Sequence, residues 1–346
     1  MFFKHKNSFI YAVAAFSSSC LIAFFVVFSL FYYSDIDLKK DEIYIQKGDS
    51  LSDVIISLDL DSGSKFKLKF VMRFLSLYDD VKPGKHSFED VVSIGDFVKN
   101  ITSSPRTEIT ILEGWSLKDI GNYLDTNNDL YSIDIDNFNQ LCKNRNFINK
   151  NLKNIDTQNI LTLEGYLYPE TYKVDPYINE TNLIKVFIAE FLNKTKSYNR
   201  RINNEVMIVA SLIEAETDLI SEMDTISSVY NNRINGIPKR MKLQADPTIL
   251  FYMPDDSLAM FKDRSSLKAK RLSATVWKKY KNMDNPYNTY KYLMPPGPIN
   301  SPRIEAIEAA LKPADTNYLY MVMRSSLGRH LFSEDFETHD KRVKGN

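Results

Sequence analysis

Two segments of this chain, LEGYLYPETY at Leu163–Tyr172 and ASLIEAET at Ala210–Thr217, place acidic residues inside otherwise apolar sequence. The second segment belongs to a stretch, Glu205–Glu216, that contains no Gly or Pro. Apolar residues recur in this stretch at steps of three and four, which is the period of a helix, and they occupy nearly every side. The sequence therefore predicts a buried helix here.

Glu214 is the acidic residue of this helix that we expect to carry chemistry. At roughly 100° per residue it stacks on Met207 and Ala210, whereas Glu216 points roughly 200° away. A carboxyl group among apolar neighbours has a raised pKa, which suits a general acid working near neutral pH. The alternative is a helix-end Glu that makes a structural hydrogen bond or salt bridge.

The composition is that of a folded chain. Its 346 residues, 44% of them hydrophobic, are enough for two or three units with sizeable cores. Lys plus Arg and Asp plus Glu number 44 each, so the net charge gives no reason to expect nucleic acid as a partner.

The amino terminus carries an uncharged, apolar run over residues 8–33, long enough to cross a membrane. Lys4 and Lys6 precede the run. The positive-inside tendency therefore leaves the tail, residues 1–7, in the cytoplasm and exports the remainder. A cleaved signal peptide is the alternative, although the apolar part of such peptides is usually only about 7 to 15 residues long.

No metal or cofactor site is predicted. Cys20 falls in the apolar run, so Cys142 has no cysteine partner in the exported part. The four His residues form no His-Glu-x-x-His motif, and the chain has neither a Gly-rich phosphate loop nor a Gly-x-Ser-x-Gly elbow. Zinc, nucleotide-driven and serine-hydrolase chemistry are therefore not expected.

A repeat relates IYIQKGDSLSDV at Ile43–Val54 to ITILEGWSLKDI at Ile109–Ile120. Each copy predicts a short strand, a Gly turn, and a helix opened by a Ser or Asp cap. The first copy resembles the start of a LysM module, a small βααβ fold used on glycans, which we assign to residues 34–105. A shared supersecondary unit without sugar binding is the alternative. The second copy lies in a connecting segment, residues 106–155.

Three further motifs follow, MKLQADPTI at Met241–Ile249, NPYNTYKY at Asn285–Tyr292 and MPPGPINSP at Met294–Pro302. The first sets polar side chains between apolar ones. The second has aromatic and amide groups of the kind that stack on and hydrogen-bond a sugar. The third contains too many prolines for a helix or a central strand, so we expect a rigid loop that presents binding groups.

Together these motifs resemble the MltG (YceG-like) endolytic murein transglycosylase family, from the membrane anchor to the end and most densely over Leu163–His339. In that family the first Glu of an Ala-Ser-x-x-Glu-x-Glu-Thr helix is catalytic, and it corresponds to Glu214. The chain departs from the family pattern at Ala215 and Ala245, neither of which removes a catalytic group. The resemblance also implies substrate-binding candidates at motif positions: Glu216, Gln244, Asp246, Thr248, Tyr287, Asn288, Thr289, Tyr290, Asn300 and Ser301.

The resemblance implies non-hydrolytic cleavage of the β-1,4 bond between N-acetylmuramic acid and N-acetylglucosamine in nascent glycan strands. Glu214 would protonate the glycosidic oxygen and then accept the proton of the muramyl C6 hydroxyl as that hydroxyl attacks C1, leaving a 1,6-anhydromuramyl end. This chemistry needs one acid, whereas ordinary glycosidases use two carboxylates. Glu164 and Glu170 keep a two-carboxylate hydrolase open. The alternative from another class is a non-catalytic, membrane-anchored scaffold that binds peptidoglycan and recruits wall synthases.

The expected fold class is α+β, with a transmembrane helix, the LysM-like domain, the connecting segment, and a mixed α/β catalytic domain over residues 156–346. We expect a single-pass inner-membrane protein whose catalytic domain is periplasmic. There it would terminate glycan elongation, with peptidoglycan synthases as partners. Residues 262–281 are rich in Lys and Arg, and they form either a solvated insertion or a basic patch for anionic lipid or wall polymer.

Overall fold

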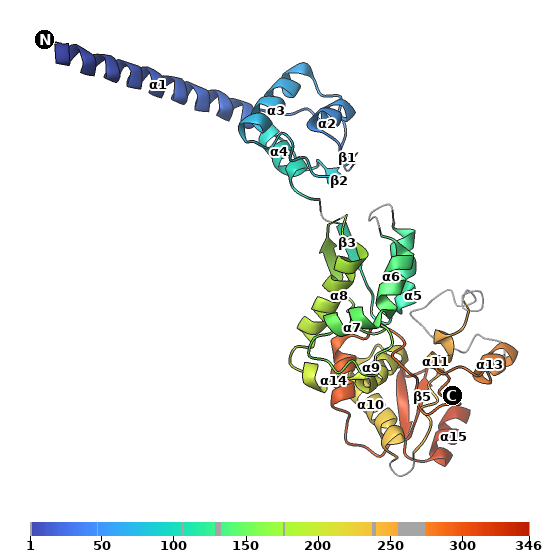
Figure 1. The fold of residues 1–346 in the computed structure, drawn as a ribbon. Coiled ribbons are helices and arrows are strands. Elements are labelled where there is room, and N and C mark those ends of the chain that lie inside the picture. The colour runs from blue at the N-terminus through green and yellow to red at the C-terminus, as the bar shows by residue number, and fades with distance from the viewer. Residues whose placement is uncertain are drawn as a thin grey trace. The chain divides into compact units, whose positions relative to one another are not determined.

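The structure, a computed structural model, describes residues 2–46, 48–105, 107–128, 133–175, 177–236, 240–254 and 274–345 (Figure 1). The chain divides into two compact units, Met1–Thr107 (unit 1) and Glu108–Asn346 (unit 2). Helices dominate both units, and the described strands pair into two-stranded sheets, β1 with β2, β3 with β4, and β5 with β6. The predicted mixture of helix and strand is thus confirmed.

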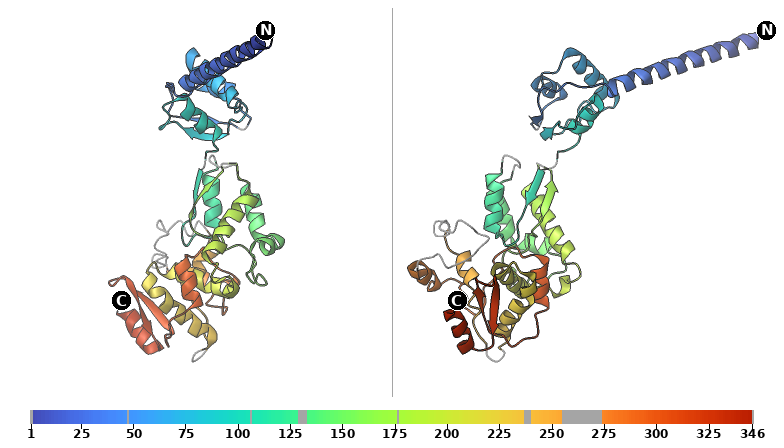
Figure 2. Two further views of the ribbon diagram at one scale, coloured as in Figure 1. Left: turned by 90° about the vertical axis from the view of Figure 1, so that its left-hand side faces the viewer. Right: turned by 180° about the vertical axis from the view of Figure 1, so that it is seen from behind.

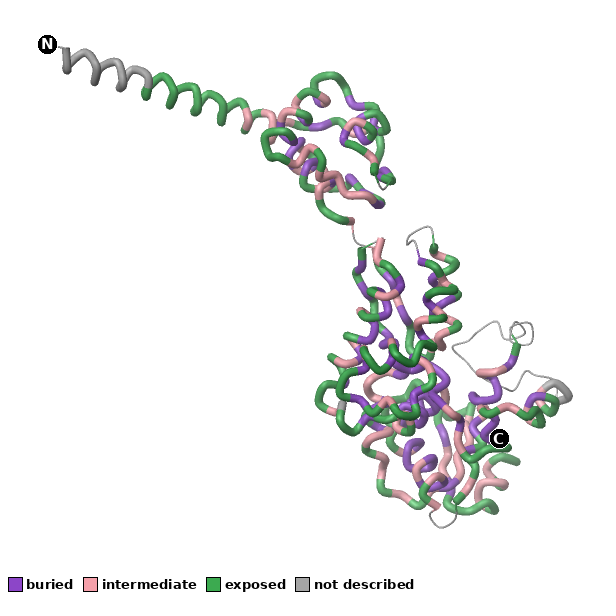
Figure 3. Tube along the Cα trace, viewed as in Figure 1, coloured by how far each residue is buried: buried purple, intermediate pink, exposed green. Residues whose placement is uncertain are grey.

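Unit 1 begins with a long apolar helix, α1 (Phe2–Tyr32). Within it, Ala14–Tyr32 is long and apolar enough to cross a membrane, and its most apolar stretch is not buried inside the protein (Figure 3). Near its carboxyl end the helix contacts the rest of the unit, where Phe28, Phe31 and Tyr32 pack against the core. The predicted apolar amino-terminal helix is therefore present.

The rest of unit 1 consists of β1 (Glu42–Ile45), α2 (Leu51–Ser57), α3 (Ser62–Phe74), β2 (Gly84–Ser87) and α4 (Ile94–Thr102). The two strands are antiparallel, with Glu42 opposite Ser87. Side chains alternate along β1, so Ile43 and Ile45 enter the core while Glu42 and Tyr44 face outward. The order strand, helix, helix, strand is the one predicted for residues 34–105, and α4 is an addition to it.

The predicted repeat has the same local structure in both copies. Gly48 and Gly114 have φ of 102° and 75°, in the left-handed region that favours Gly. Ser50 and Ser116 then form capping boxes at the first turns of α2 and of α5 (Leu117–Thr126). Each helix therefore begins where the sequence pattern predicts.

The first part of unit 2 is built around one core. Its elements are β3 (Thr107–Thr110), α5, α6 (Ile135–Lys143), α7 (Arg145–Asn151), β4 (Thr171–Val174) and α8 (Glu180–Lys194). Ile109, Ile120 and Leu124 belong to the same buried cluster as Tyr166 and Phe187. Residues before and after position 155 thus share a single core.

The predicted connecting segment, residues 106–155, takes part in this shared core. The boundary between the two units falls at Thr107/Glu108, so nearly all of the segment belongs to unit 2. A short strand and three short helices are too few to enclose a core of their own. They bury their apolar faces against α8 and the segment that precedes it.

The second part of unit 2 surrounds helix α9 (Asn204–Glu216), which packs against α10 (Ile220–Asn235) and α14 (Ile304–Leu311), and these two helices also contact each other (Figures 1 and 2). The buried helix predicted over Glu205–Glu216 is confirmed, since every residue from Met207 to Glu214 is buried. Around it lie a 3₁₀ turn, two short helices, a hairpin and the last helix: Asn199–Arg201, α11 (Asp246–Phe251), α13 (Ala274–Lys281), β5 (Tyr320–Arg324), β6 (Arg329–Ser333) and α15 (Phe336–Lys344).

Helix α9 is buried because it separates two cores. Met207 and Ala210 belong to the core of the first part of unit 2, whereas Ile208, Leu212 and Ile213 belong to the core of the second part. Its carboxyl end, which carries the acidic residues, therefore lies where the two parts of unit 2 meet.

Candidate active site

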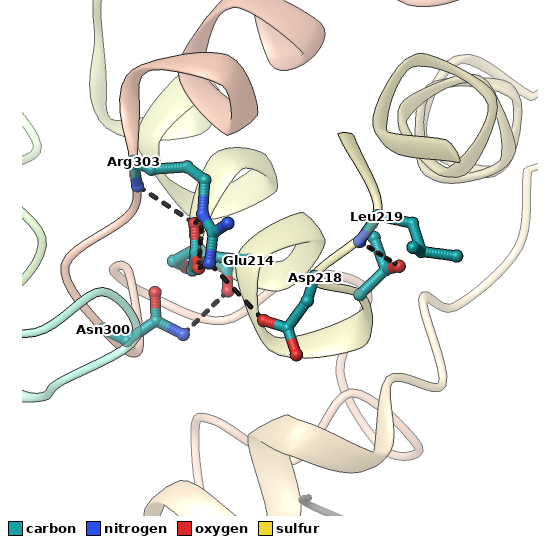
Figure 4. Close-up of polar contacts among 7 residues, drawn as sticks. Glu214, Asp218, Leu219, Asn300 and Arg303 are labelled. Atoms are coloured by element: carbon teal, nitrogen blue, oxygen red, sulfur yellow. Dashed lines mark hydrogen bonds and ion pairs between the residues drawn. The ribbon is translucent and has the colours of Figure 1, made fainter. Parts of the chain in front are cut away.

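Glu214 lies in the last turn of α9 with only 2% of its side chain exposed. All hydrogen bonds that its carboxylate makes among the described residues come from Arg303, just before α14 (Figure 4). The Arg303 backbone N–H donates to Oε2 at 3.0 Å, Nε donates to both oxygens at 3.0 Å, and Nη2 donates to Oε1 at 2.7 Å. The candidate acid is thus held from one side by one basic residue.

Two opposing effects act on the pKa of Glu214. Burial raises its pKa, and this is the larger effect, so the pKa lies above its ordinary value. The hydrogen bonds and the charge of Arg303 act in the opposite direction, while the carboxylate of Glu113 adds to the rise. The predicted elevated pKa is therefore supported by the geometry, and Arg303 limits it.

Glu216 has different neighbours, as the helical angle predicts. Its Oε1 accepts a hydrogen bond of 2.7 Å from the hydroxyl of Tyr230, which is fully buried in α10. Burial raises the pKa of Glu216, and the Tyr230 hydrogen bond opposes the rise. Glu214 and Glu216 therefore lie in different environments, with different hydrogen-bond partners.

The proline-rich loop at Met294–Pro302 docks directly on α9. The Ile299 backbone N–H donates to Ser211 Oγ at 3.1 Å, and Asn300 Nδ2 donates to the Ser211 carbonyl at 2.9 Å (Figure 4). On its other side, the loop exchanges backbone hydrogen bonds with the second repeat, from Gly114 N–H to Ser301 O at 2.9 Å and from Ser301 N–H to Trp115 O at 2.7 Å. The loop thus joins the second repeat to α9.

The LEGYLYPETY segment also contacts this loop. Gly165 has φ of 82°, and a Cβ at that position would lie 2.8 Å from Pro298 Cβ. Only Gly allows the two backbones to approach so closely. The two segments that dominate the sequence are therefore brought together through a third one, the proline-rich loop.

Two predicted substrate-binding residues in the loop have polar atoms without a partner. Asn300 Oδ1 and Ser301 Oγ are buried and accept or donate no hydrogen bond among the described residues. Asn300 is 4% exposed and Ser301 is 1% exposed. Buried polar atoms are nearly always satisfied, so these two atoms keep a hydrogen-bonding capacity that the described residues do not use.

Other candidates form a second cluster in which most side chains bond to the protein itself. Thr248 and Thr289 are fully buried and bond to each other at 2.9 Å, and both bond to the backbone of Ala245. Asn288 Nδ2 donates to the carbonyls of Lys281 and Met283 at 2.9 and 2.8 Å. These three candidates hold the loops in place and present no polar atom to solvent.

Four residues of this cluster lie nearer the surface. Gln244 is exposed, although its φ of 49° is unusual for a residue with a side chain. The hydroxyl of Tyr290 donates to Asp246 Oδ1, and burial raises the pKa of this carboxyl while that hydrogen bond opposes the rise. Tyr287 reaches toward Gly297 of the proline-rich loop, where its hydroxyl lies 3.2 Å from the position a Cβ would take. Burial raises the pKa of Tyr287 to about 12.

The two other acidic residues singled out by the sequence are not equivalent. Glu164 is 5% exposed and accepts hydrogen bonds of 3.0 and 3.2 Å from the Leu117 N–H at the start of α5. Burial raises the pKa of Glu164 to about 8, although those hydrogen bonds oppose the rise. Glu170 lies at the surface in an ion pair of 3.2 Å with Lys194.

Sequence reasoning missed Arg303. The signal that could have found it is its place as the first charged residue after Lys291, directly following the rigid loop. Residues 262–273 of the basic stretch lie outside the described residues, and residues 274–281 form α13. Within the described part of the chain, no cluster of His, Cys, Asp or Glu could hold a metal ion.

A model of the YceG-like family matches residues 43–345 of this chain. An endolytic murein transglycosylase of Bacillus subtilis is 33% identical over 201 residues, which cover 56% of this chain and 48% of that protein. A protein of the same name from Streptococcus pneumoniae is 26% identical over 294 residues, which cover 77% of this chain and 51% of that protein. The chain thus spans about half the length of these relatives.

A crystal structure of a yceG-like protein from Listeria monocytogenes is similar to this structure at a TM-score of 0.54 and 24% identity. The match covers 88% of this chain and 100% of the other. At this level of identity the similarity concerns the fold.

Proposed function

The chain belongs to the YceG-like family, and on that basis we propose that it is a membrane-anchored endolytic transglycosylase acting on peptidoglycan. The names of the relatives from Bacillus subtilis and Streptococcus pneumoniae support the reaction class. The observation that carries the proposal is the environment of Glu214, a buried carboxyl group with a raised pKa at the end of an apolar helix.

The proposed reaction uses Glu214 twice. As an acid, it protonates the glycosidic oxygen between N-acetylmuramic acid and N-acetylglucosamine, and the C1–O bond breaks. As a carboxylate, it then accepts the proton of the muramyl C6 hydroxyl, whose oxygen forms the new bond to C1. The product ends in 1,6-anhydromuramic acid. The reaction consumes no water and needs no second carboxylate.

The substrate contacts that we propose divide into two groups. Asn300 Oδ1 and Ser301 Oγ, the two unpaired atoms beside Glu214, bind donors and acceptors of the sugar. Gln244 and Tyr287 add contacts from the second cluster. The remaining candidates position these groups through the bonds described above: Glu216, Asp246, Thr248, Asn288, Thr289 and Tyr290.

The setting of this activity is also part of the proposal. Helix α1 crosses the inner membrane with residues 1–7 in the cytoplasm and the catalytic unit in the periplasm, where it cuts nascent strands and ends their elongation beside peptidoglycan synthases. The βααβ order of unit 1 supports a LysM-like glycan-binding role for residues 34–105.

Replacing Glu214 with Gln tests the reaction, because Gln keeps the shape and removes the titrating proton. We expect Glu214→Gln to release anhydromuramyl fragments from purified sacculi about 10² to 10⁴ times more slowly than the unmodified chain. Glu205→Gln, an exposed substitution in the first turn of the same helix, is the matched control. Mass analysis distinguishes anhydro ends from reducing ends, and reducing ends alone would indicate a hydrolase.

A non-catalytic scaffold is the second candidate function. The observation in its favour is that Arg303 satisfies both oxygens of Glu214, as in a structural ion pair. If the unmodified chain binds sacculi but releases no fragments, and Glu214→Gln binds equally well, the scaffold is the correct function.

A further inference from the structure

The contact between Arg303 and Glu214 conflicts with the acid role of Glu214. A guanidinium group donates hydrogen bonds and accepts none, and both carboxylate oxygens receive donors from it. A proton on either oxygen of Glu214 would therefore face an N–H group. The observed arrangement suits the carboxylate, whereas the first step of the proposed reaction needs the protonated acid.

Arg303 also blocks access to Glu214. The side chain of Glu214 is 2% exposed, while that of Arg303 is 22% exposed and lies over it. Both oxygens of this nearly covered carboxyl group already accept hydrogen bonds from Arg303, so a glycosidic oxygen would have to compete with the guanidinium for them. Release of the pair is thus required both for protonation and for contact with the substrate.

The outer side of the guanidinium can accept a second anion. Nη2 also contacts Asp218 Oδ1, but at 3.4 Å and with the Asp218 side chain 81% exposed, so this contact is weak (Figure 4). Nη1 donates to no acceptor among the described residues. Nη1 is therefore free among the described residues, and an anion that displaces the weak Asp218 contact would reach a second donor on Nη2, so that the two nitrogens form the fork that binds a carboxylate.

The other charged groups near α9 do not offer Glu214 a different partner. Glu113, from the loop between β3 and α5, is the other charged group that acts on it, and it is also acidic. On α10, Glu222 pairs with His330 at 2.9 Å, and on α11, Asp246 is bonded to Tyr290. Among the described residues, Arg303 is the cation that pairs with Glu214, and it opposes the rise in pKa that burial causes.

We propose that Arg303 is a positioning residue that exchanges partners, leaving Glu214 when a carboxylate of the muramic acid residue, on its lactyl group or its stem peptide, binds the guanidinium. The proposal rests on the proposed function. Once Arg303 has turned to the substrate, burial still acts on Glu214 while the opposing charge is neutralised, so Glu214 takes up one proton from solvent. Substrate binding thereby produces the acid that cleaves the substrate.

The test compares three substrates: glycan strands with free stem-peptide carboxylates, the same strands with those carboxyls blocked as methyl amides, and strands stripped of stem peptides, which expose the lactyl carboxylate. For the unmodified chain we expect blocking to lower kcat/KM for anhydromuramyl release about tenfold or more, the range of a charge-assisted hydrogen-bonded pair. For Arg303→Gln we expect no effect of blocking. The stripped strands identify the source, since they retain full activity only if the lactyl carboxylate binds Arg303.

The pH dependence provides a second readout, which a merely structural Arg303 would not change. In the unmodified chain the basic limb of kcat, which reports the substrate complex, should lie at higher pH than the basic limb of kcat/KM, which reports the free enzyme. In Arg303→Gln the two limbs should coincide at the higher pH. Arg303→Lys, which keeps the charge, should restore part of the separation.

Arg201→Gln removes the same charge from an exposed site and should respond to blocking as the unmodified chain does. An equal effect of blocking on the unmodified chain and on Arg303→Gln would overturn the proposal, as would unshifted limbs in a variant whose thermal unfolding is unchanged. If the unmodified chain releases no anhydromuramyl ends from any substrate, the proposed function itself fails instead.

Discussion

Two carboxyl groups that are two residues apart on α9 have partners of opposite character. The partner of Glu216 is Tyr230, a fully buried side chain of a packed helix, so that contact is fixed by the core. The partner of Glu214 is Arg303, which reaches the surface and can leave without disturbing a core. At the residue scale, this difference is what makes Glu214 the candidate acid and Glu216 a supporting residue.

Gln244 combines an exposed side chain with left-handed backbone, which costs a residue with a side chain about 1 kcal/mol relative to Gly. Gln244→Gly should therefore raise the free energy of unfolding by up to about that amount, whereas Gln244→Ala should not. If the amide binds substrate, both variants should lose activity on sacculi. A Gly variant that is more stable and fully active would mean that the amide makes no contact with substrate.

Glu164 should make the stability of unit 2 depend on pH. Its folded pKa of about 8 lies above the ordinary value of 4.5, so its contribution is fully present below about pH 4.5 and is lost as the pH rises through about 8. At about 1.4 kcal/mol per pKa unit, the free energy of unfolding should fall by a few kcal/mol across that range.

Urea unfolding of Glu164→Gln at a series of pH values checks this expectation. The variant should lose most of the slope, since Gln still accepts the Leu117 N–H but does not ionise. Glu170→Gln, at the surface, should keep it. A slope that persists unchanged in Glu164→Gln would assign the pH dependence to another group.

At the scale of elements, the site depends on one loop that touches three others. The proline-rich loop bonds to α9 through Ser211, to the second repeat through Gly114 and Trp115, and packs on Gly165. Prolines restrict the loop before it docks, so little conformational entropy remains to be lost on folding. Arg303 follows directly after this loop. Its position therefore depends on how the loop packs against α9, the second repeat and Gly165.

Gly165→Ala should disturb this docking. The new Cβ meets Pro298 at 2.8 Å in a residue with φ of 82°, so we expect a loss of at least about 2 kcal/mol in stability together with a loss of activity. Gly328→Ala is the matched control, because its φ is 62° but no atom lies within 4 Å of the new Cβ. It should cost about 1 kcal/mol and leave activity intact. Equal losses in both variants would show that backbone strain alone matters.

At the scale of the whole molecule, the two units have cores that share no residue. Unit 1 surrounds the end of α1 with a small core of its own, and unit 2 contains the whole candidate site. We therefore expect each unit to unfold on its own account. The apolar helix α1 thus belongs to unit 1, whereas the candidate site around Glu214 belongs to unit 2.

The two Trp residues, Trp115 and Trp277, both belong to unit 2, so tryptophan fluorescence reports unit 2 alone. Leu124→Ala, in the unit 2 core, should lower the Tm seen by fluorescence, since removing a fully buried Leu costs about 2–5 kcal/mol. Leu68→Ala, equally buried in unit 1, should leave that Tm unchanged. A comparable drop for Leu68→Ala would indicate that the units unfold together.

Local rules in the sequence determined much of the local structure. Apolar residues at steps of three and four predicted a helix from Glu205, and α9 starts one residue earlier, at Asn204. The prediction is close because this spacing marks the buried face of a helix. The predicted Ser or Asp cap after each Gly turn marks the starts of α2 and α5, because a cap and the amide groups that it binds lie within four residues of each other. The helical angle likewise places Glu214 and Glu216 on different faces without any knowledge of tertiary contacts.

The tertiary structure decided which distant segments meet. Arg303 lies 89 positions from Glu214, and Ser301 is even further along the chain from Gly114, so no local rule links them. The same holds for the unit boundary, which depends on whether residues 106–155 can bury their apolar faces alone. The candidate acid and its helix can therefore be predicted from local sequence patterns. The residue that holds the acid can be found only in the folded structure, because long-range packing brings Arg303 to Glu214.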